Sequence, residues 1–220
     1  MKIAVIGANR GIGLALVEEL VARGDEVYAF CRQTSDSLNN SGAKKIFSDF
    51  EVTNQSKMQS ILNNSGISDL DQVYHVSGIM RSTTLDDFNI DLITEQFMVN
   101  AVAPILSVKS FLPVLASDAK IGLVTSRMGS ITDNTSGGAY GYRMSKSALN
   151  AAGKSLSEDL KGQGKSVFLL HPGWVKTDMT NQNGLIDTKE SALGMMKIMN
   201  QKSLEDTGTF WHTNGDHLPW

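Results

Sequence analysis

The feature that most constrains the fold is a glycine-rich turn, which lies between an apolar strand and an amphipathic helix at the start of the chain. Lys2–Ile6 (KIAVI) is a short, β-branched apolar run, typical of a buried parallel strand. Glycines follow at positions 7, 11 and 13, and apolar residues recur at helical spacing from Ile12 to Ala22. Backbone N–H groups at a helix N-terminus attract phosphates, and glycines let a ligand approach the main chain. This order predicts a dinucleotide-binding turn, although a tight turn without a ligand would show the same pattern.

The end of the second strand-like run indicates which dinucleotide this turn binds. Glu26–Phe30 (EVYAF) is followed by Cys31-Arg32-Gln33, which contains no acidic residue. An acidic residue at this point suits the free 2′-hydroxyl of NAD(H), whereas a nearby arginine suits the 2′-phosphate of NADP(H). Arg32, together with Arg10 in the glycine-rich turn, therefore favours NADP(H) over NAD(H). The alternative is that each arginine is only a solvated surface charge.

Strand-like and helical runs alternate through the rest of the chain. Further strands are expected at residues 45–48, 71–77, 121–125, 167–170 and 209–212, and helices at residues 52–62, 86–115, 142–160 and 186–199. Such alternation is typical of right-handed crossovers between parallel strands. The sequence therefore predicts one α/β domain over residues 1–220, a Rossmann fold whose doubly wound parallel sheet of about seven strands is flanked by helices.

Composition excludes several classes of protein. The chain has 220 residues, of which 41% are hydrophobic and 20% charged, as expected of one domain with a sizeable core. A net charge of −3 gives no electrostatic reason to expect nucleic acid as a partner. The single cysteine, Cys31, permits no internal disulfide and favours a reducing compartment. With no signal peptide and no apolar run near the ~20 residues of a membrane span, we expect a cytoplasmic protein that spans no membrane.

The segment from Ser126 to Lys146 carries the strongest chemical signal. Tyr142 and Lys146 are four residues apart, so on a helix they share one face. A cation near a phenol favours the phenolate and lowers the pKa of the tyrosine, which then exchanges protons near neutral pH. Ser126 follows the strand expected at residues 121–125, and ligands of open α/β sheets bind at the carboxyl ends of the strands. An ordinary helix-capping serine is the alternative reading of Ser126.

Two further sets of polar residues need an interpretation. Asn100 lies four residues before Pro104 in an apolar helix, so it is either a buried structural amide or a site residue. The four histidines and the cysteine show no metal-ligand spacing, and we expect no metal. The histidines are His75, His171, His212 and His217.

Taken in this order, the motifs resemble those of the classical short-chain dehydrogenase/reductase family over nearly the whole chain. The motifs are Gly7-x-x-x-Gly11-x-Gly13, Asp49, His75-Val-Ser-Gly78, Asn100 with Pro104, Ser126 with Gly129, Tyr142-x-x-x-Lys146, and Pro172-Gly173-x-Val175-x-Thr177. Within the family, the short length, the SGGAYGYRMSK run and the C-terminal tryptophan resemble the C-factor-like and small carbonyl-reductase branch.

The resemblance implies a catalytic role for four residues. Ser126 would hydrogen-bond the substrate carbonyl oxygen, and Tyr142 would be the general acid in reduction and the base in oxidation. Lys146 would lower the pKa of Tyr142 and hold the nicotinamide ribose, and Asn100 would anchor a water relay. The hydride chemistry itself belongs to the cofactor.

The resemblance also implies a set of cofactor-binding residues. Asp49 and Phe50 would meet the adenine, Gly78 would meet the adjacent ribose, and Val175 and Thr177 would meet the nicotinamide carboxamide. The full implied set is Gly7, Asn9, Arg10, Gly11, Ile12, Gly13, Arg32, Asp49, Phe50, Gly78, Asn100, Tyr142, Lys146, Pro172, Gly173, Val175 and Thr177.

Some positions depart from the family pattern. His75-Val-Ser-Gly78 replaces the usual Asn-Asn-Ala-Gly and removes side-chain amides, and Ile6 replaces a common threonine. The spacing from Ser126 to Tyr142 is long, so the loop between them must bulge. The segment from Thr177 to the last helix, which forms a lid in this family, is short. A short lid implies an open pocket or a large substrate.

We therefore expect an NADPH-dependent oxidoreductase that transfers a hydride between NADP(H) and a small carbonyl or alcohol substrate. The alternative is an NADP(H)-binding signalling or regulatory protein of the C-factor type with little or no turnover. The family's pairing through the helices of Asn100 and Tyr142 implies a homodimer or homotetramer. A serine hydrolase built on Ser126, His171 and Asp178 is disfavoured, because Ser126 lacks the glycines of a nucleophile elbow.

Overall fold

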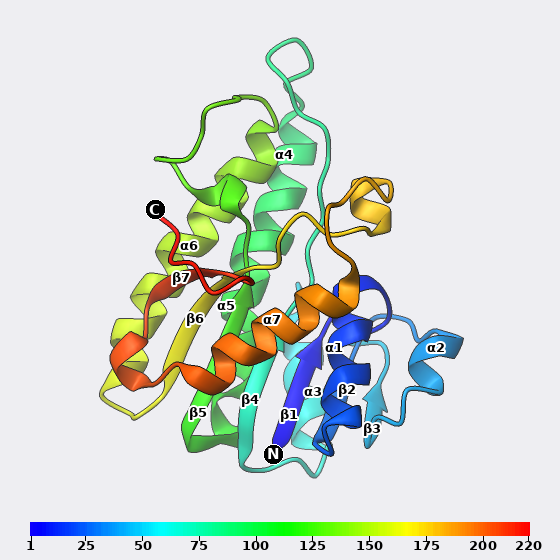
Figure 1. Ribbon diagram of the computed structural model, residues 1–220. Helices are drawn as coiled ribbons and strands as arrows, with labels where there is room; N and C mark the ends of the chain where they lie inside the picture. The colour runs from blue at the N-terminus through cyan, green and yellow to red at the C-terminus, as the bar shows by residue number, and fades with distance from the viewer.

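Seven parallel strands form one sheet in the computed structural model, which describes all 220 residues (Figure 1). The strands are β1 (Lys2–Ile6), β2 (Glu26–Phe30), β3 (Lys45–Phe47), β4 (Leu70–His75), β5 (Leu115–Val124), β6 (Ser166–His171) and β7 (Thr209–His212). Their order is β3-β2-β1-β4-β5-β6-β7, and every neighbouring pair is parallel. The order reverses on either side of β1, so the doubly wound parallel sheet predicted from the alternation of elements is confirmed.

Helices cover both faces of this sheet. They are α1 (Gly11–Ala22), α2 (Asp36–Asn39), α3 (Gln55–Asn63), α4 (Ile90–Phe97), α5 (Ala103–Phe111), α6 (Tyr140–Lys161) and α7 (Thr188–Gln201). Short turns add η1 (Met98–Val102, π-helical) and the 3₁₀ turns η2 (Leu112–Val114), η3 (Arg127–Gly129), η4 (Asp178–Thr180) and η5 (Leu204–Asp206). In Figure 1, α1 and α7 lie in front of the sheet, and α3 and α5 lie behind it.

The strands alternate their side chains between two apolar layers, as the two-residue period of a strand requires. Ile3 and Val5 of β1 pack into the layer with α1 and α7, which includes Met195. Ala4 and Ile6 of the same strand pack into the opposite layer, beneath α3 and α5. Because both faces are covered, β1, β2 and β6 are nearly continuous apolar runs, and this pattern made them predictable from the sequence.

Some boundaries differ from those expected. The helix expected from residue 86 begins at Ile90, because the Asn89 side chain accepts a hydrogen bond from the Leu92 N–H at 3.0 Å and caps that helix. The strand expected from residue 121 begins earlier, at Leu115, and its pairing with β4 is irregular near Leu70. The short helix α2 was not expected.

The expectation that no apolar run approaches the length of a membrane span is wrong by length and composition. The helical stretch Ile90–Val114 has 25 residues, and its most apolar 18-residue part has a mean hydropathy of 1.5. Of the most apolar part of this stretch, 44% is buried inside the protein, where α4 packs against α6 and α5 packs against α3. One such helix is weak evidence for a membrane, because a core helix passes the same test.

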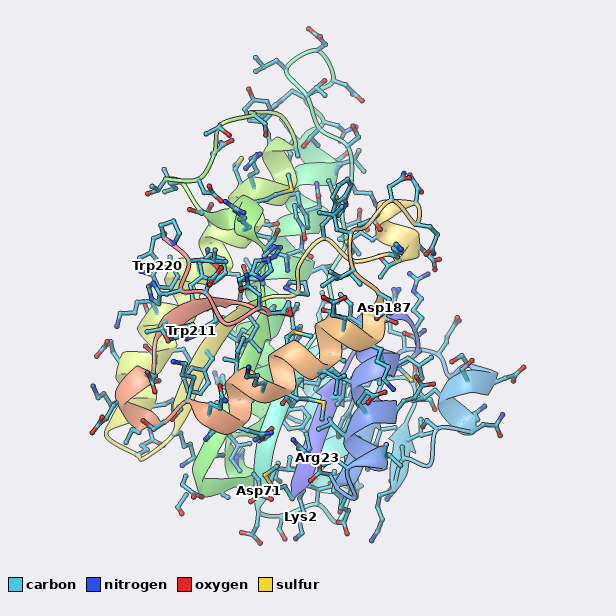
Figure 2. The ribbon with its side chains drawn as sticks, in the orientation of Figure 1. Lys2, Arg23, Asp71, Asp187, Trp211 and Trp220 are labelled. Atoms are coloured by element: carbon cyan, nitrogen blue, oxygen red, sulfur yellow. The ribbon has the colours of Figure 1, made fainter.

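Parallel strands bring the seven carboxyl ends to one edge of the sheet. Figure 2 marks the two edges: Lys2 and Asp71 lie together at the amino edge, where the Lys2 N–H donates to the Asp71 carboxylate at 2.6 Å. Asp187 lies toward the opposite edge, where it caps the start of α7 by accepting from the Glu190 N–H at 2.7 Å. The glycine-rich turn, Ser126 and Pro172 follow β1, β5 and β6, so all three lie at the carboxyl edge.

Candidate active site

The glycine-rich turn between β1 and α1 leaves no room for side chains. Gly7 has φ +91° and Gly11 has φ +54°, which lie in the left-handed region that favours glycine. A Cβ on Gly7 would lie 2.7 Å from the Ser77 Oγ, and a Cβ on Gly13 would lie 2.1 Å from the Gly7 carbonyl oxygen. The turn therefore requires glycine at positions 7 and 13 for close packing of the main chain.

The start of α1 fits the phosphates of a dinucleotide. Arg10, the N-cap residue, makes no side-chain capping bond, and no acidic residue lies in the first turn. The N–H groups of Gly11, Ile12 and Gly13 at the beginning of this helix have no partner within it, and the helix dipole favours an anion there. These features are those of a turn that can bind an anion.

A substitution of Gly13 tests how tightly this turn is packed. Gly13→Ala is expected to destabilise the protein by about 3 kcal/mol, because the new Cβ meets the rigid Gly7 main chain and cannot be relieved by a rotamer change. The measurement is the free energy of unfolding in urea. Gly162→Ala is the matched control, because Gly162 has φ −64° and nothing lies within 4 Å of its Cβ position. Equal stability of the two variants would contradict the tight packing.

Three polar residues, Asn9, Arg10 and Arg32, lie on or near the turn. Arg10 is exposed and forms an ion pair with Asp178 at 3.3 Å. Arg32 is exposed just after β2, and no acidic residue stands between it and the strand. The Asn9 carbonyl oxygen accepts a hydrogen bond from the Ser35 hydroxyl at 2.7 Å, which ties the turn to the segment before α2.

The two residues expected at the adenine, Asp49 and Phe50, differ in how far their side chains are exposed. Asp49 has φ +61°, and its exposed carboxylate forms an ion pair with Lys57 at 2.6 Å. Phe50 is buried, with its ring packed edge-on against Phe30 and Phe111. The apolar core therefore takes the Phe50 ring, and the Phe50 N–H donates to the Cys31 carbonyl oxygen at 3.0 Å. A contact between Phe50 and the adenine stays a prediction.

Ser126 lies at the carboxyl edge of the sheet, two residues after the end of β5 at Val124. Its hydroxyl oxygen accepts a hydrogen bond from the Met128 N–H at 3.1 Å and so caps the short turn η3. The capping role considered for Ser126 is therefore present. The same side chain also interacts with Tyr142, so capping does not remove it from the site.

Tyr142 and Lys146 are brought together on the first turns of α6, as their spacing predicts. Tyr142 is 8% exposed and Lys146 is 3% exposed. The Lys146 Nζ lies 5.8 Å from the centre of the Tyr142 ring. The ammonium donates a hydrogen bond to the Val124 carbonyl oxygen at 3.0 Å, at the end of β5. The strand next to α6 thus holds Lys146 beside the tyrosine.

The electrostatics of this pair differ from the expectation based on spacing. Burial raises the pKa of Tyr142 above its ordinary value, and the hydrogen bond with the Ser126 side chain lowers it by a smaller amount. Burial also lowers the pKa of Lys146 to about 8. In the protein alone, burial therefore outweighs the hydrogen bond with Ser126 in setting the pKa of Tyr142, and the phenol stays protonated at neutral pH.

Asn100 lies in the π-helical turn η1, between α4 and α5, and is fully buried. Its amide oxygen accepts from the Ile79 N–H at 2.8 Å, and its amide nitrogen donates to the Ile79 carbonyl at 2.8 Å and to the Ser145 hydroxyl at 3.0 Å. The side chain is therefore a satisfied structural amide, and through Ser145 it contacts the helix of the Tyr142–Lys146 pair. A role of Asn100 in the site stays a prediction.

The remaining implied residues line the same edge. Gly78 lies against the site, because a Cβ there would be 3.2 Å from the Asn100 Oδ1 and 3.6 Å from the Lys146 Nζ. After β6, the Pro172 carbonyl accepts from Ser191 at 2.6 Å and Gly173 has φ +84°. Two residues follow on this segment: Val175 has a buried side chain, and Thr177 is half-buried.

Sequence reasoning missed two residues that shape the loop between Ser126 and Tyr142. Arg143 donates to the Met128 carbonyl at 3.3 Å and to the Ser136 hydroxyl at 2.8 Å, which holds the bulged loop against α6. Thr83 is buried and accepts from the Gly141 N–H at 2.8 Å, so it caps α6 from 58 residues away in sequence. No local pattern indicates such long-range contacts.

The histidines and Asp178 do not form a hydrolytic site. Asp178 pairs with Arg10, and the His171 ring packs edge-on against His212 at 4.9 Å between ring centres. Burial lowers the pKa of His75 and of His171 to about 3, so both are neutral. No group of three or more histidine, cysteine, aspartate or glutamate residues has the arrangement of a metal site.

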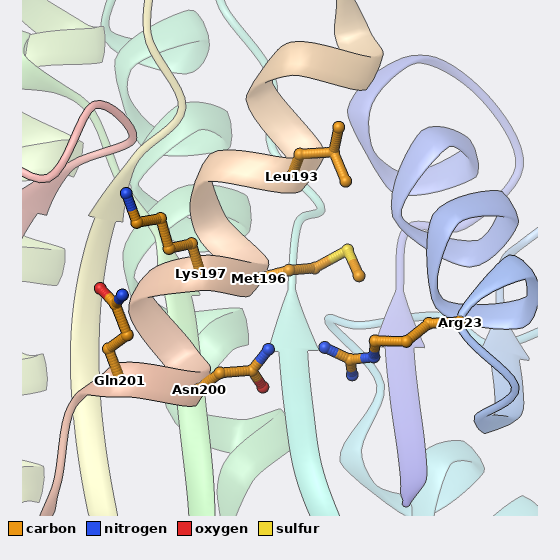
Figure 3. A pocket seen from close by; sticks show the side chains of 6 residues that line it. All are labelled: Arg23, Leu193, Met196, Lys197, Asn200 and Gln201. Atoms are coloured by element: carbon orange, nitrogen blue, oxygen red, sulfur yellow. The ribbon is translucent and has the colours of Figure 1, made fainter.

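Two hollows lie outside this constellation. One, of about 370 Å³, lies between α7 and the end of α1, where Arg23 points toward Met196 and Asn200 (Figure 3). The other, of about 560 Å³, lies beside the start of α6 and is lined in part by Phe97, Tyr140 and Met144. Neither contains Ser126, Tyr142 or Lys146.

Comparison with known proteins assigns the chain to a family. The family described as short chain dehydrogenase matches residues 1–185. The chain therefore belongs to the short-chain dehydrogenase family, whose members are oxidoreductases. A nicotinamide cofactor and a small-molecule substrate follow from this membership and from the neighbouring structures.

Three relatives illustrate the similarity. The chain is 36% identical to 1-hydroxy-2-glutathionyl-2-methyl-3-butene dehydrogenase of Rhodococcus sp. (strain AD45), over 99% of each protein. It is 38% identical to C-signal of Myxococcus xanthus, over 73% of this chain and 91% of that protein. Among solved structures, NADPH-bound carbonyl reductase from chicken fatty liver superposes with a TM-score of 0.90 and 30% identity, covering 100% of this chain and 98% of the other.

Proposed function

We propose that this protein is an NADP(H)-dependent carbonyl reductase in which Tyr142 is the general acid. The observation that carries the proposal is the buried Tyr142, which interacts with Ser126 and lies beside Lys146 at the carboxyl edge of the sheet. A domain that only binds a dinucleotide has no physical need for this proton-transferring set. The alternative of a C-factor-type binder without turnover is therefore not favoured.

The residues around the turn and the strand ends hold the cofactor in this proposal. The free N–H groups of Gly11, Ile12 and Gly13 bind the diphosphate, and Arg10 and Arg32 bind the 2′-phosphate. The main chain near Asp49, Gly78 and Thr177 contacts the remaining groups. When bound, the nicotinamide supplies the hydride, and the protein supplies orientation and the proton.

Proton transfer is assigned to Tyr142. Ser126 hydrogen-bonds the substrate oxygen, and the Tyr142 hydroxyl donates its proton to that oxygen as it gains negative charge. Burial, which raises the pKa of Tyr142, keeps this proton in place at neutral pH. The protonated state favours carbonyl reduction over alcohol oxidation near neutral pH. Lys146 holds the nicotinamide ribose, and Asn100 links its helix to the chain at Ile79.

The test of this function is a substrate screen with purified protein and both cofactors. Aldehydes, ketones and quinones form the core of the panel, because carbonyl reductases are among the neighbouring structures. Glutathione-conjugated carbonyls and alcohols are included, because the Rhodococcus relative is named for such a substrate. Oxidation of NADPH with at least one carbonyl supports the proposal. Tight NADPH binding with no turnover of any panel member would support the C-factor-type alternative instead.

The cofactor preference is a separate prediction. NADPH is expected to bind about 10–100-fold more tightly than NADH, because hydrogen bonds from Arg10 and Arg32 to a charged phosphate are worth roughly 1.5–3 kcal/mol. Dissociation constants from tryptophan fluorescence provide the measurement. The double variant Arg10→Ala/Arg32→Ala should bring the two constants close together by weakening NADPH alone. Similar constants in the unaltered protein would contradict the roles of both arginines.

A further inference from the structure

An ion pair joins the glycine-rich turn to the segment between β6 and α7. The Arg10 Nη1 lies 3.3 Å from the Asp178 Oδ2, and the two residues are 168 positions apart in the sequence. The side chains are 74% and 72% exposed, so both remain open to solvent and to a ligand. Neither side chain has another ion-pair partner in the protein.

Asp178 is held in place by its own segment. It begins the 3₁₀ turn η4, in which Thr177 and Thr180 form a reciprocal capping box. The Gln182 amide donates to the second oxygen of Asp178 at 3.3 Å. The Thr177 methyl group lies 3.6 Å from the Cβ position of Gly11, so this segment rests directly against the turn. In Figure 1 the segment lies above the start of α1.

From this contact we propose that Asp178 sets the strength of the preference for NADPH by competing with the 2′-phosphate for Arg10. The inference rests on the proposed function, which assigns Arg10 to that phosphate. A guanidinium that turns toward a phosphate has less of its charge and fewer of its N–H groups for its carboxylate partner, and the carboxylate repels the incoming phosphate. Asp178 therefore weakens NADPH binding and leaves NADH binding unchanged, and NADPH releases η4 from the turn.

The expected size of the effect follows from the exposure of the pair. Exposed ion pairs are weak, so Asp178→Asn should tighten NADPH binding about 2–5-fold at low ionic strength. NADH, which lacks the 2′-phosphate, should bind the variant and the unaltered protein equally. The gain for NADPH should shrink with added salt, because the screening length falls from about 30 Å at 0.01 M to about 3 Å at 1 M.

The experiment measures dissociation constants of NADPH and NADH by calorimetry, at low and high salt, for the unaltered protein and the variants. Asp159→Asn is the matched control, because Asp159 is an exposed residue of α6 that forms no ion pair and changes the net charge equally. A double-mutant cycle with Arg10→Ala completes the set, and the effect of Asp178→Asn should fall to near onefold in that background.

The outcomes separate this inference from the proposed function. The competition is supported if Asp178→Asn binds NADPH more tightly, Asp159→Asn does not, and the gain disappears in the Arg10→Ala background. Weaker or unchanged NADPH binding by Asp178→Asn, in a protein that still prefers NADPH, would overturn the competition and leave the proposed cofactor intact. An equal gain for NADH would also overturn it. A lack of preference in the unaltered protein would overturn the cofactor assignment itself.

Discussion

Replacement of Tyr142 by phenylalanine is expected to lower kcat/KM for carbonyl reduction by about 10²–10⁴-fold, the usual contribution of a positioned acid. The change removes only the hydroxyl that supplies the proton. Because the ring stays buried against the same neighbours, the fold and the cofactor-binding turn should be retained. The measurement is the steady-state rate of NADPH oxidation with the best carbonyl from the substrate screen.

The chain offers a matched control for this variant. Tyr140 lies one residue before Gly141 on the same helix, packs edge-on against Phe88, and has Met144 rather than a lysine four residues later. Tyr140→Phe should therefore leave kcat/KM within a few-fold of the unaltered protein. NADPH should bind both variants with similar dissociation constants. Undiminished turnover by Tyr142→Phe would rule out this tyrosine as the general acid.

A second large effect is expected in the core, where Phe30→Ala should destabilise the protein by about 3–5 kcal/mol. Phe30 at the end of β2 is fully buried, stacked on Phe47 at 4.7 Å and packed edge-on against Phe50 and Phe111 at 4.8 and 5.1 Å. Truncation removes all of these contacts and leaves a cavity among rings that cannot collapse to fill it. The free energy of unfolding in urea is the measurement.

Leu85→Ala is the control for the core variant, because Leu85 is 75% exposed on the loop before α4. Its substitution should change the free energy of unfolding by no more than about 0.5 kcal/mol. A similarly small change for Phe30→Ala would show that the aromatic cluster does not support β2 and β3. A loss of stability in Phe30→Ala but not in Leu85→Ala would show that the aromatic cluster stabilises β2, the strand that Arg32 follows.

Much of the fold could be predicted because its signals are local. The strand, glycine-rich turn and helix at the start are set by residues adjacent in sequence, and β1, β2 and β7 begin and end where expected. Strands β1, β2 and β6 are largely apolar because both sheet faces are covered, which leaves a clear pattern. Helix α4 begins at Ile90 and not at residue 86, because the Asn89 cap rather than the apolar pattern determines where that helix starts.

In the candidate site too, the features with local sequence signals could be predicted, and those that depend on distant segments could not. The spacing of Tyr142 and Lys146 places them on one helix face, and the position of Ser126 after a parallel strand places it at the carboxyl edge. Both follow from the sequence alone. Arg143 and Thr83, which hold the loop and cap α6, were missed because their partners come from the folded chain rather than from a motif.

Only the tertiary structure decided how the groups of the site behave. Burial reversed the direction expected for the pKa of Tyr142, because desolvation depends on every segment that covers the phenol and not on its neighbour four residues away. The core took the ring of Phe50, and the pair between Arg10 and Asp178 joined segments 168 residues apart. Residue type and spacing determined which groups are present at the site, whereas packing determined how far each group is exposed to solvent, its protonation state and its contact partners.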